Sequence, residues 1–166
     1  MNTIQLIERA RYYFGLSELE KHNVEGGVLN IHIGDVFSPQ SAAISAGYAG
    51  IIVDLFAEGK VLPQLEQAAT WLEMYDKLMP GGRIMVNCGA AEEDDDAASS
   101  SSWKANATIR ALCEAFPGQV NWKKMPKSAG ENYMGLTGSL PDFTAWSAAL
   151  PNQLSSTLHH WQMASN

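Results

Sequence analysis

Residues 48–63, YAGIIVDLFAEGKVLP, decide the fold class of this chain. Within this stretch, Gly50 to Asp54 form a short, continuous apolar run that ends in an acid. A run of this kind is typical of a strand that is buried on both faces of a parallel sheet. We therefore predict a buried strand that ends at Asp54, with the Asp54 carboxylate at its carboxyl end.

The segments on either side of this strand alternate between helical and strand periodicity. Pro80-Gly81-Gly82 and Pro117-Gly118 are expected to end two of the helices, because neither motif continues a helix. The pattern predicts, in chain order, a helix over 3–14, strands over 28–33 and 50–54, a helix over 61–78, a strand over 83–88, a helix over 105–116, strands over 120–124 and 133–137, and one or two short helices within 140–166.

This order of elements predicts an α/β fold. Strands that alternate with helices are joined by crossover connections and therefore form a largely parallel sheet. We expect one domain over 1–166, with a Rossmann-like, mostly parallel sheet, helices on both faces and an antiparallel pair of strands at the end. No linker divides the chain.

The charge of the chain argues against polyanionic partners. Lys and Arg number 11 against 18 Asp and Glu, a net charge of −7, so neither nucleic acid nor an anionic membrane is expected to bind. Five of the acids, 92–96, precede two alanines and four serines, and we predict a mobile acidic and serine-rich surface loop over 90–102. The run lacks the spacing of a calcium loop, so no metal is expected there.

The cysteines and the amino-terminal residues indicate in which cellular compartment the protein is expected. Cys88 and Cys113 lie in no Cys-x-x-Cys motif and are expected to be core residues in a reducing compartment. No apolar stretch approaches the ~20 residues of a membrane span, and residues 1–5 have no signal-peptide character. We expect an intracellular, soluble protein, with cytoplasm and plastid not distinguished.

Two acids at predicted strand ends are the candidate ligand-binding residues. Ligands bind outside the carboxyl ends of strands in such sheets. Asp35 follows Gly34, and an acid there can present its carboxylate beside a backbone amide, the donor–acceptor pair that reads an adenine edge. Asp54 faces the same crevice. The alternative for both residues is that each simply caps a turn.

Four segments, ARYYFGL (10–16), LNIHIGDVF (29–37), 48–63 and LMPGGRIMVNCG (78–89), resemble the C-terminal two thirds of spermidine-synthase-like proteins. These form the aminopropyltransferase branch of the S-adenosylmethionine-dependent methyltransferase superfamily, and the likeness is greatest to the plant spermidine-synthase-like group. The resemblance implies that S-adenosylmethionine or its decarboxylated form is the cofactor. It also implies that Gly34 and Asp35, with Val36 beside them, read the adenine, and that Asp54 lies next to the reacting group.

The sequence departs from this family in two places. Where the synthases resemble Asp-Ser-Ser-Asp-Pro, this chain has Asp54-Leu55-Phe56-Ala57-Glu58, so the general-base position is Ala57 and Glu58 stands one residue further along. The family's first two strands and glycine-rich loop also find no counterpart before Met1. We therefore expect an N-terminally truncated domain that binds S-adenosyl nucleosides weakly or not at all.

Two functions remain open at this stage. One is a transferase-family domain, inactive or weakly binding as this chain, and the other is a non-catalytic oligomerising or regulatory remnant of the same fold. Without the family's first strand, residues 51–54 lack a neighbour on one side. Either the strand over 28–33 pairs with them, or a second copy of the chain does, and we expect a homo-oligomer.

Overall fold

The computed structural model describes residues 3–38, 45–91, 101–140, 142–151, 155 and 160–165. Contacts between Cα atoms divide the chain into two compact units, Met1–Ala43 and Ile44–Asn166. The sequence pattern, which predicts one domain, shows no boundary at this place.

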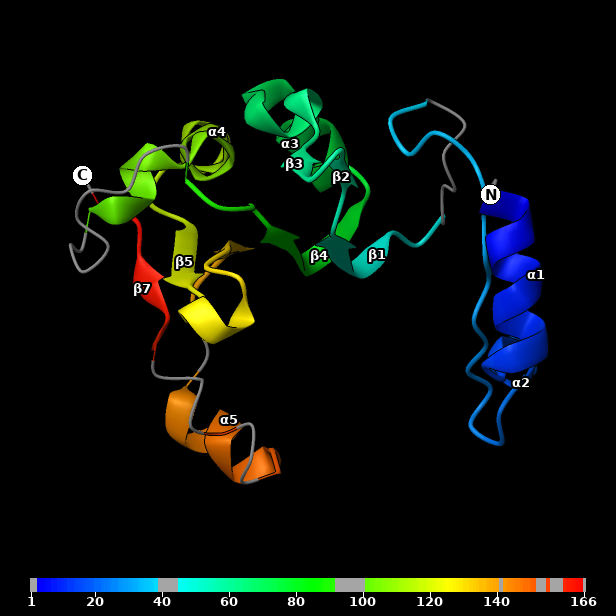
Figure 1. Cartoon of the computed structure of the whole chain (residues 1–166). Coiled ribbons are helices and arrows are strands. Elements are labelled where there is room, and N and C mark those ends of the chain that lie inside the picture. The colour runs from blue at the N-terminus through cyan, green and yellow to red at the C-terminus, as the bar shows by residue number, and fades with distance from the viewer. Residues whose placement is uncertain are drawn as a thin grey trace. The chain divides into compact units, whose positions relative to one another are not determined.

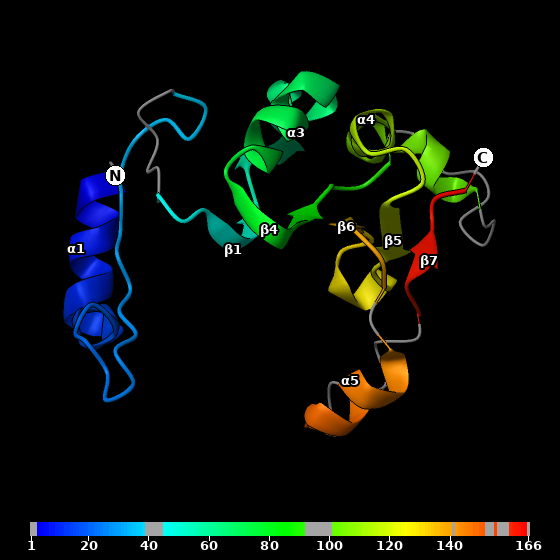
Figure 2. The ribbon, with the colours of Figure 1, turned by 180° about the vertical axis from the view of Figure 1, so that it is seen from behind.

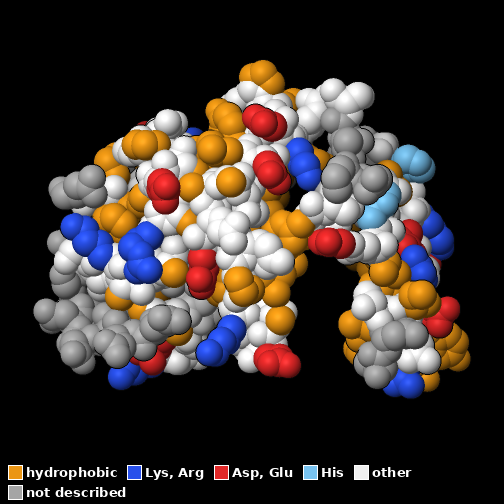
Figure 3. Space-filling model, turned by 90° about the horizontal axis from the view of Figure 1, so that it is seen from above, with side chains coloured by type: hydrophobic (Ala, Val, Ile, Leu, Met, Phe, Trp, Pro, Cys, Tyr) orange, Lys and Arg blue, Asp and Glu red, His pale blue; other side chains and the backbone are white. Residues whose placement is uncertain are grey.

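The first unit contains helices α1 (Thr3–Tyr13) and α2 (Leu16–Leu19). Gly15 separates them with φ of 72°, a left-handed conformation that glycine adopts without strain, and the predicted helix over 3–14 is confirmed. Neither helix buries a residue. Tyr12 of α1 is 81% exposed and Phe14, between the helices, is 84% exposed, and Figure 3 shows apolar side chains at the surface of this unit.

The prediction of a strand over 28–33 is wrong. These residues form no ladder with any described strand. The segment is tied to the helices of its own unit by a hydrogen bond from Leu29 N to Leu19 O, at 2.9 Å. An alternating sequence becomes a strand only when a neighbouring strand supplies hydrogen bonds, and in the described part of the chain none does so here.

The second unit is built on a five-stranded sheet of order β1-β4-β6-β5-β7. Strands β1 and β4 are parallel, and the other three neighbouring pairs are antiparallel, so the prediction of a mostly parallel sheet is wrong for the described strands. The strands over 120–124 and 133–137 are confirmed as an antiparallel pair. The bounds are β1 Tyr48–Val53, β4 Leu78–Asn87, β5 Val120–Lys124, β6 Tyr133–Thr137 and β7 Gln162–Met163.

The prediction of one helix over 61–78 is wrong. This range contains the end of strand β3 (Lys60–Val61), the 3-10 helix η1 (Pro63–Glu66), helix α3 (Ala68–Tyr75) and the first residue of β4. Strand β2 (Phe56–Ala57) precedes the range and pairs with β3. Within this range, the predicted helical spacing forms an α-helix only in α3. Pro63 lies in the first turn of η1, where the N–H group that proline lacks would have no helical partner.

The motif Pro80-Gly81-Gly82 lies inside β4 instead of before it. Tyr48 of β1 pairs with Leu78 but Gly50 pairs with Arg83, so residues 79–82 form a bulge. Gly81 has φ of 81°. A Cβ atom on Gly82 would lie 2.7 Å from the carbonyl oxygen of Tyr48, so the close approach of the two strands requires glycine there.

Helices α3 and α4 (Ala107–Ala115) pack together against one face of this sheet (Figure 1). Ile109 and Leu112 of α4 and Ile84 of β4 are fully buried, and the Trp71 indole of α3 donates a hydrogen bond to Leu65 O at 2.9 Å. The helix predicted over 105–116 is thus confirmed as the main core element. Helix α5 (Phe143–Ala149) lies away from α3 and α4 and buries no residue (Figure 2).

Strand β1 is at the edge of the sheet that the described strands form, with β4 as its one neighbour there. Ile52 is 80% exposed, whereas its neighbour Val53 is 4% exposed. The prediction that this strand is buried on both faces is therefore wrong, because α3 and α4 cover one face and side chains alternate between the two faces along a strand.

Most of the loop predicted over 90–102 lies outside the described residues, which stop at Ala91 and resume at Ser101. At its carboxyl end, Ser102 is 8% exposed and begins the 3-10 helix η2 (Ser102–Ala105), so the chain is docked on the unit from that residue. No helix in the described ranges is long and apolar enough to cross a membrane.

Candidate functional site

Three polar side chains form a network where β1 and β4 end. Asn87 donates from Nδ2 to Asp54 Oδ1 at 3.1 Å, and its Oδ1 accepts from Asn132 Nδ2 at 3.0 Å and from Gly89 N at 3.2 Å. Asp54 remains exposed. The network presents the Asp54 carboxylate in a defined direction at the carboxyl end of a parallel pair of strands, which is where ligands bind in sheets of this type.

Asn106 lines a cleft at the start of α4 and is a candidate site residue that the sequence pattern did not single out. It is 2% exposed and caps α4, with Oδ1 accepting from Ile109 N at 3.0 Å. Its Nδ2 donates to Cys88 O at 2.9 Å and Gly89 O at 3.3 Å, so it ties the start of α4 to the end of β4. The signal in the sequence is an Asn directly before an apolar helical pattern, the preferred residue at a helix start.

The residues after Asp54 form a tight hairpin of β2 and β3. Both turn residues have positive φ, 53° at Glu58 and 78° at Gly59, as in a two-residue type I′ turn. Glu58 therefore occupies the exposed tip of the hairpin, and Ala57 lies in β2. At Ala57, where the resemblance implies a general base, the side chain is a methyl group.

A cleft of about 550 Å³ lies between this hairpin, the end of β4 and the start of α4. Gly89 is essential to its shape, because a Cβ atom there would lie 2.7 Å from Val61 Cγ2. Neither Asp54 nor Glu58 lines the cleft. Its lining residues are Phe56, Gly59, Lys60, Val61, Pro63, Glu66, Cys88, Gly89, Ala90, Ala91, Ala105, Asn106, Ala107 and Thr108.

The predicted adenine-reading residues lie in the first unit, and Asp54 lies in the second. Asp35 Oδ1 accepts from Phe37 N at 3.0 Å, and Asp35 O accepts from Ser38 N at 3.1 Å. This is the turn-capping geometry that was the alternative role of Asp35. Gly34, Asp35 and Val36 are all exposed, and an adenine-binding role for them stays a prediction.

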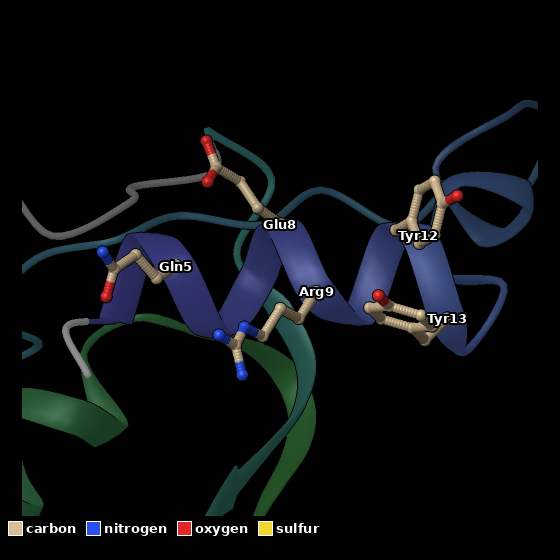
Figure 4. Close-up of a pocket in the computed structure, with 5 residues that line it drawn as sticks. All are labelled: Gln5, Glu8, Arg9, Tyr12 and Tyr13. Atoms are coloured by element: carbon tan, nitrogen blue, oxygen red, sulfur yellow. The ribbon is translucent and has the colours of Figure 1, made fainter.

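A separate hollow follows the surface of α1 (Figure 4). Its lining residues all come from this one helix, and Glu8 and Tyr12 point to the side away from Arg9. It contains none of the residues that the sequence singles out as a site. The lining residues are Gln5, Glu8, Arg9, Tyr12 and Tyr13.

The two thiols of the second unit are held in their protonated form. Burial raises the pKa of Cys88 far above its ordinary value and raises that of Cys113 to about 11. Since the thiolate is the nucleophile and the metal ligand, neither cysteine is activated at neutral pH. In the described ranges, no three His, Cys, Asp or Glu side chains are grouped so as to hold a metal ion.

One solved structure has a fold similar to that of this chain. The crystal structure of a probable spermidine synthase from Corynebacterium glutamicum ATCC 13032 matches with a TM-score of 0.56 and 16% sequence identity, over 96% of this chain and 54% of that chain. This chain therefore spans about half the length of that protein. No protein-family model and no curated protein matches the chain. The similarity shows the fold alone: a mixed α/β fold like that of the probable spermidine synthase.

Proposed function

We propose that this chain is a spermidine-synthase-like domain, of the plant type that its sequence resembles, which binds an S-adenosyl nucleoside weakly and does not transfer aminopropyl groups. The observation that supports it is the Asp54 carboxylate, held by Asn87 at the carboxyl ends of β1 and β4. In Rossmann-like sheets this edge is the ligand-binding edge. The fold similarity to a probable spermidine synthase supports the same assignment.

The proposed ligand is decarboxylated S-adenosylmethionine or S-adenosylmethionine. In the second unit, Asp54 would contact the part of the ligand next to its reacting group. The adenine-reading role that the resemblance gives to Gly34, Asp35 and Val36 is a separate proposal for the first unit. Weak binding follows from the observed state of Asp35, whose carboxylate already accepts a hydrogen bond from Phe37 N. That hydrogen bond already satisfies part of the carboxylate, so a ligand amine that binds to its remaining acceptor sites gains less than it would from a fully unsatisfied carboxylate.

The absence of transfer activity follows from the hairpin. An amine acceptor must lose a proton as it attacks, and a carboxylate within hydrogen-bond reach is the usual base. Ala57 supplies no such group. Glu58 is exposed at the tip of a two-residue turn, and this turn requires the positive φ of 53° that Glu58 adopts. Deprotonation of the acceptor is therefore not supported by a side chain of this loop.

Calorimetric titration with the two S-adenosyl compounds tests the binding part of the proposal. We expect weak, saturable binding that Asp54→Asn and Asp35→Ala each abolish, with a melting temperature that stays within about 4 °C of the parent value. Asp76→Asn, at an exposed carboxylate that ends α3, is the matched control and should bind as the parent does. If Asp35→Ala or Asp54→Asn binds as tightly as the parent chain, the binding role assigned to that residue is refuted.

A transfer assay with decarboxylated S-adenosylmethionine and a diamine tests the other part. We expect no aminopropyl product above the reaction without protein. Product formation that Glu58→Gln removes would show that the hairpin supplies a base after all, and would overturn the proposed lack of activity.

The open edge of β1 favours a second function, self-association as an oligomerising module. Among the described strands, β1 has a hydrogen-bonding neighbour on one side only, and Ile52 on it is 80% exposed. Unpaired backbone groups beside exposed apolar side chains promote pairing with another chain, most simply about a two-fold axis.

Sedimentation velocity at a protein concentration of tens of micromolar tests whether the chain self-associates. We expect a dimer or larger species that Ile52→Lys shifts toward monomer, because a charged side chain on an edge strand opposes pairing. Leu72→Lys, on the exposed side of α3, is the control and should leave the distribution unchanged. A compact monomer for the parent chain would refute the oligomeric function and leave the nucleoside-binding proposal intact.

A further inference from the structure

The cleft between the β2–β3 hairpin, the end of β4 and the start of α4 is not part of the proposed nucleoside site, because Asp54 does not line it. Its volume of about 550 Å³ lies within the range of clefts that hold small organic ligands. Two of the polar residues that line it, Asn106 and Thr108, are each only 2% exposed. A ligand in this cleft would therefore meet polar groups that the fold holds in place.

The Thr108 hydroxyl is an unused hydrogen-bonding group in the wall of this cleft. It makes no hydrogen bond within the described part of the chain, yet it keeps accessible surface, unlike Ser102 Oγ, which has neither a partner nor accessible surface. Because Thr108 is 2% exposed and lines the cleft, this hydroxyl opens on the cleft. A hydroxyl in a buried side chain is unfavourable unless water or a ligand completes its hydrogen bonds.

The first two amides of α4, a helix of nine residues, add donors at the same place. The Asn106 side chain caps Ile109 N, which leaves the N–H groups of Ala107 and Thr108 with no acceptor in the described part of the chain. The first amides of a helix have no partner within it, and the helix dipole places partial positive charge there. Since Ala107 and Thr108 both line the cleft, its inner end favours an anion.

The charged side chains of the cleft do not decide its preference. Lys60 of β3 and Glu66 of η1 both line it and both are exposed, so their opposite charges are screened by water. The fixed donors at α4 are one hydroxyl and two amides, and the several terminal oxygens of a phosphate group match such a set at a helix start. Phe56 and Val61 of the hairpin supply an apolar wall.

We propose that this cleft binds a phosphate monoester that carries an apolar group. The phosphate oxygens would accept hydrogen bonds from the Thr108 hydroxyl and from the N–H groups of Ala107 and Thr108, with Lys60 adding attraction. The apolar group would lie against Phe56 and Val61. The site is independent of the proposed nucleoside site, because no residue is common to the two.

Titration of the ¹⁵N-labelled chain with phenyl phosphate, followed through the backbone amide signals of Ala107 and Thr108, tests this proposal. We expect both signals to move downfield and to saturate with a dissociation constant on the order of 1 mM. Thr108→Val keeps the shape without the hydroxyl and should weaken binding by about tenfold, whereas Thr108→Ser keeps the hydroxyl and should stay within about twofold of the parent. Thr144→Val, at the corresponding second position of α5, is the matched control and should leave binding unchanged.

Two ligand controls separate the phosphate from the apolar group. Phenol should produce no saturating shift, and inorganic phosphate should bind more weakly than phenyl phosphate because it buries no apolar surface. Four results would each overturn the proposal: no saturating shift with phenyl phosphate, an equal response to phenol, equal affinity for inorganic phosphate, or full affinity in Thr108→Val.

If Thr108→Val does not fold, Lys60→Glu decides, since that side chain is exposed. The reversed charge beside the cleft should weaken the binding of phenyl phosphate by about fivefold. Full affinity in Lys60→Glu would then overturn the proposal.

Discussion

Helices α1 and α4 have similar apolar spacing in the sequence but differ in what they bury. Helix α4 buries Thr108, Ile109, Ala111 and Leu112 against the sheet, whereas α1 buries no residue. The difference shows that an amphipathic pattern predicts where a helix forms and which side is apolar, but not whether that side becomes part of a core. A core also needs a second apolar surface at the right distance, and in unit 2 strands β4, β5 and β6 supply it.

The largest expected effect comes from removing a side chain of that core. Trp71→Ala deletes a fully buried indole and its hydrogen bond to Leu65 O, and should lower the free energy of unfolding by about 3–5 kcal/mol. Phe14→Ala, at an exposed position of the first unit, should change it by less than about 0.5 kcal/mol. Urea unfolding followed by tryptophan fluorescence measures both, since all five tryptophans lie after residue 44. A large loss in Phe14→Ala would show that the first unit stabilises the second.

A methyl group added between β6 and α4 should have the next largest effect. In Gly135→Ala the new Cβ would lie 2.9 Å from Leu112 Cδ1 and 3.0 Å from Val86 Cγ1, so overpacking should cost about 1–3 kcal/mol. Gly34→Ala in the first unit meets no atom within 4 Å and is the matched control. Equal urea midpoints for the two variants would mean that the sheet and α4 are less tightly packed than the contacts indicate.

Asn106, which caps α4, and Asp35, which caps a turn of the first unit, should differ in how much each stabilises the chain. Asn106→Ala removes the cap of α4 and the buried bonds to Cys88 O and Gly89 O, and should cost about 1–2 kcal/mol. Asp35→Ala removes one exposed turn hydrogen bond and should cost less than about 0.5 kcal/mol. Calorimetry measures the melting temperatures of both variants. Equal decreases relative to the parent chain would contradict this order.

The smallest effect is expected at the ion pair of the first unit. Arg11 donates two hydrogen bonds to the Glu20 carboxylate, at 2.8 and 2.6 Å, which lowers the pKa of Glu20. A lowered carboxyl pKa means that the pair stabilises the unit above the ordinary Glu range and loses this contribution as the pH falls through the lowered value. Because both groups are exposed, the effect on stability should be too small to move the unfolding midpoint.

Carboxyl titration by nuclear magnetic resonance measures this pair directly. Arg11→Gln should raise the pKa of Glu20 toward its ordinary value, while Arg9→Gln should leave it unchanged. An unchanged Glu20 titration in Arg11→Gln would show that the pair does not form in solution.

The sequence alone determined the elements whose cause is local. Helices α1 and α4 follow from apolar spacing and from the glycine and Pro-Gly motifs that end them, and strands β5 and β6 follow from short segments between turn residues. The likeness of four segments to spermidine-synthase-like proteins pointed to the fold that the comparison shows. Each of these features depends on residues that are close together in the chain.

The tertiary structure alone decided what depends on distant partners. Residues 28–33 and 120–124 both predict strands, but only β5 has neighbours to pair with. Asp54, Asn87 and Asn132 form one network although 33 and 45 residues separate Asn87 from its two partners. Ile52 is exposed because α3 and α4, the described helices that pack on this sheet, cover its other face. Pairing, burial and long-range hydrogen bonds are properties of two surfaces that meet, and a local pattern describes only one of them.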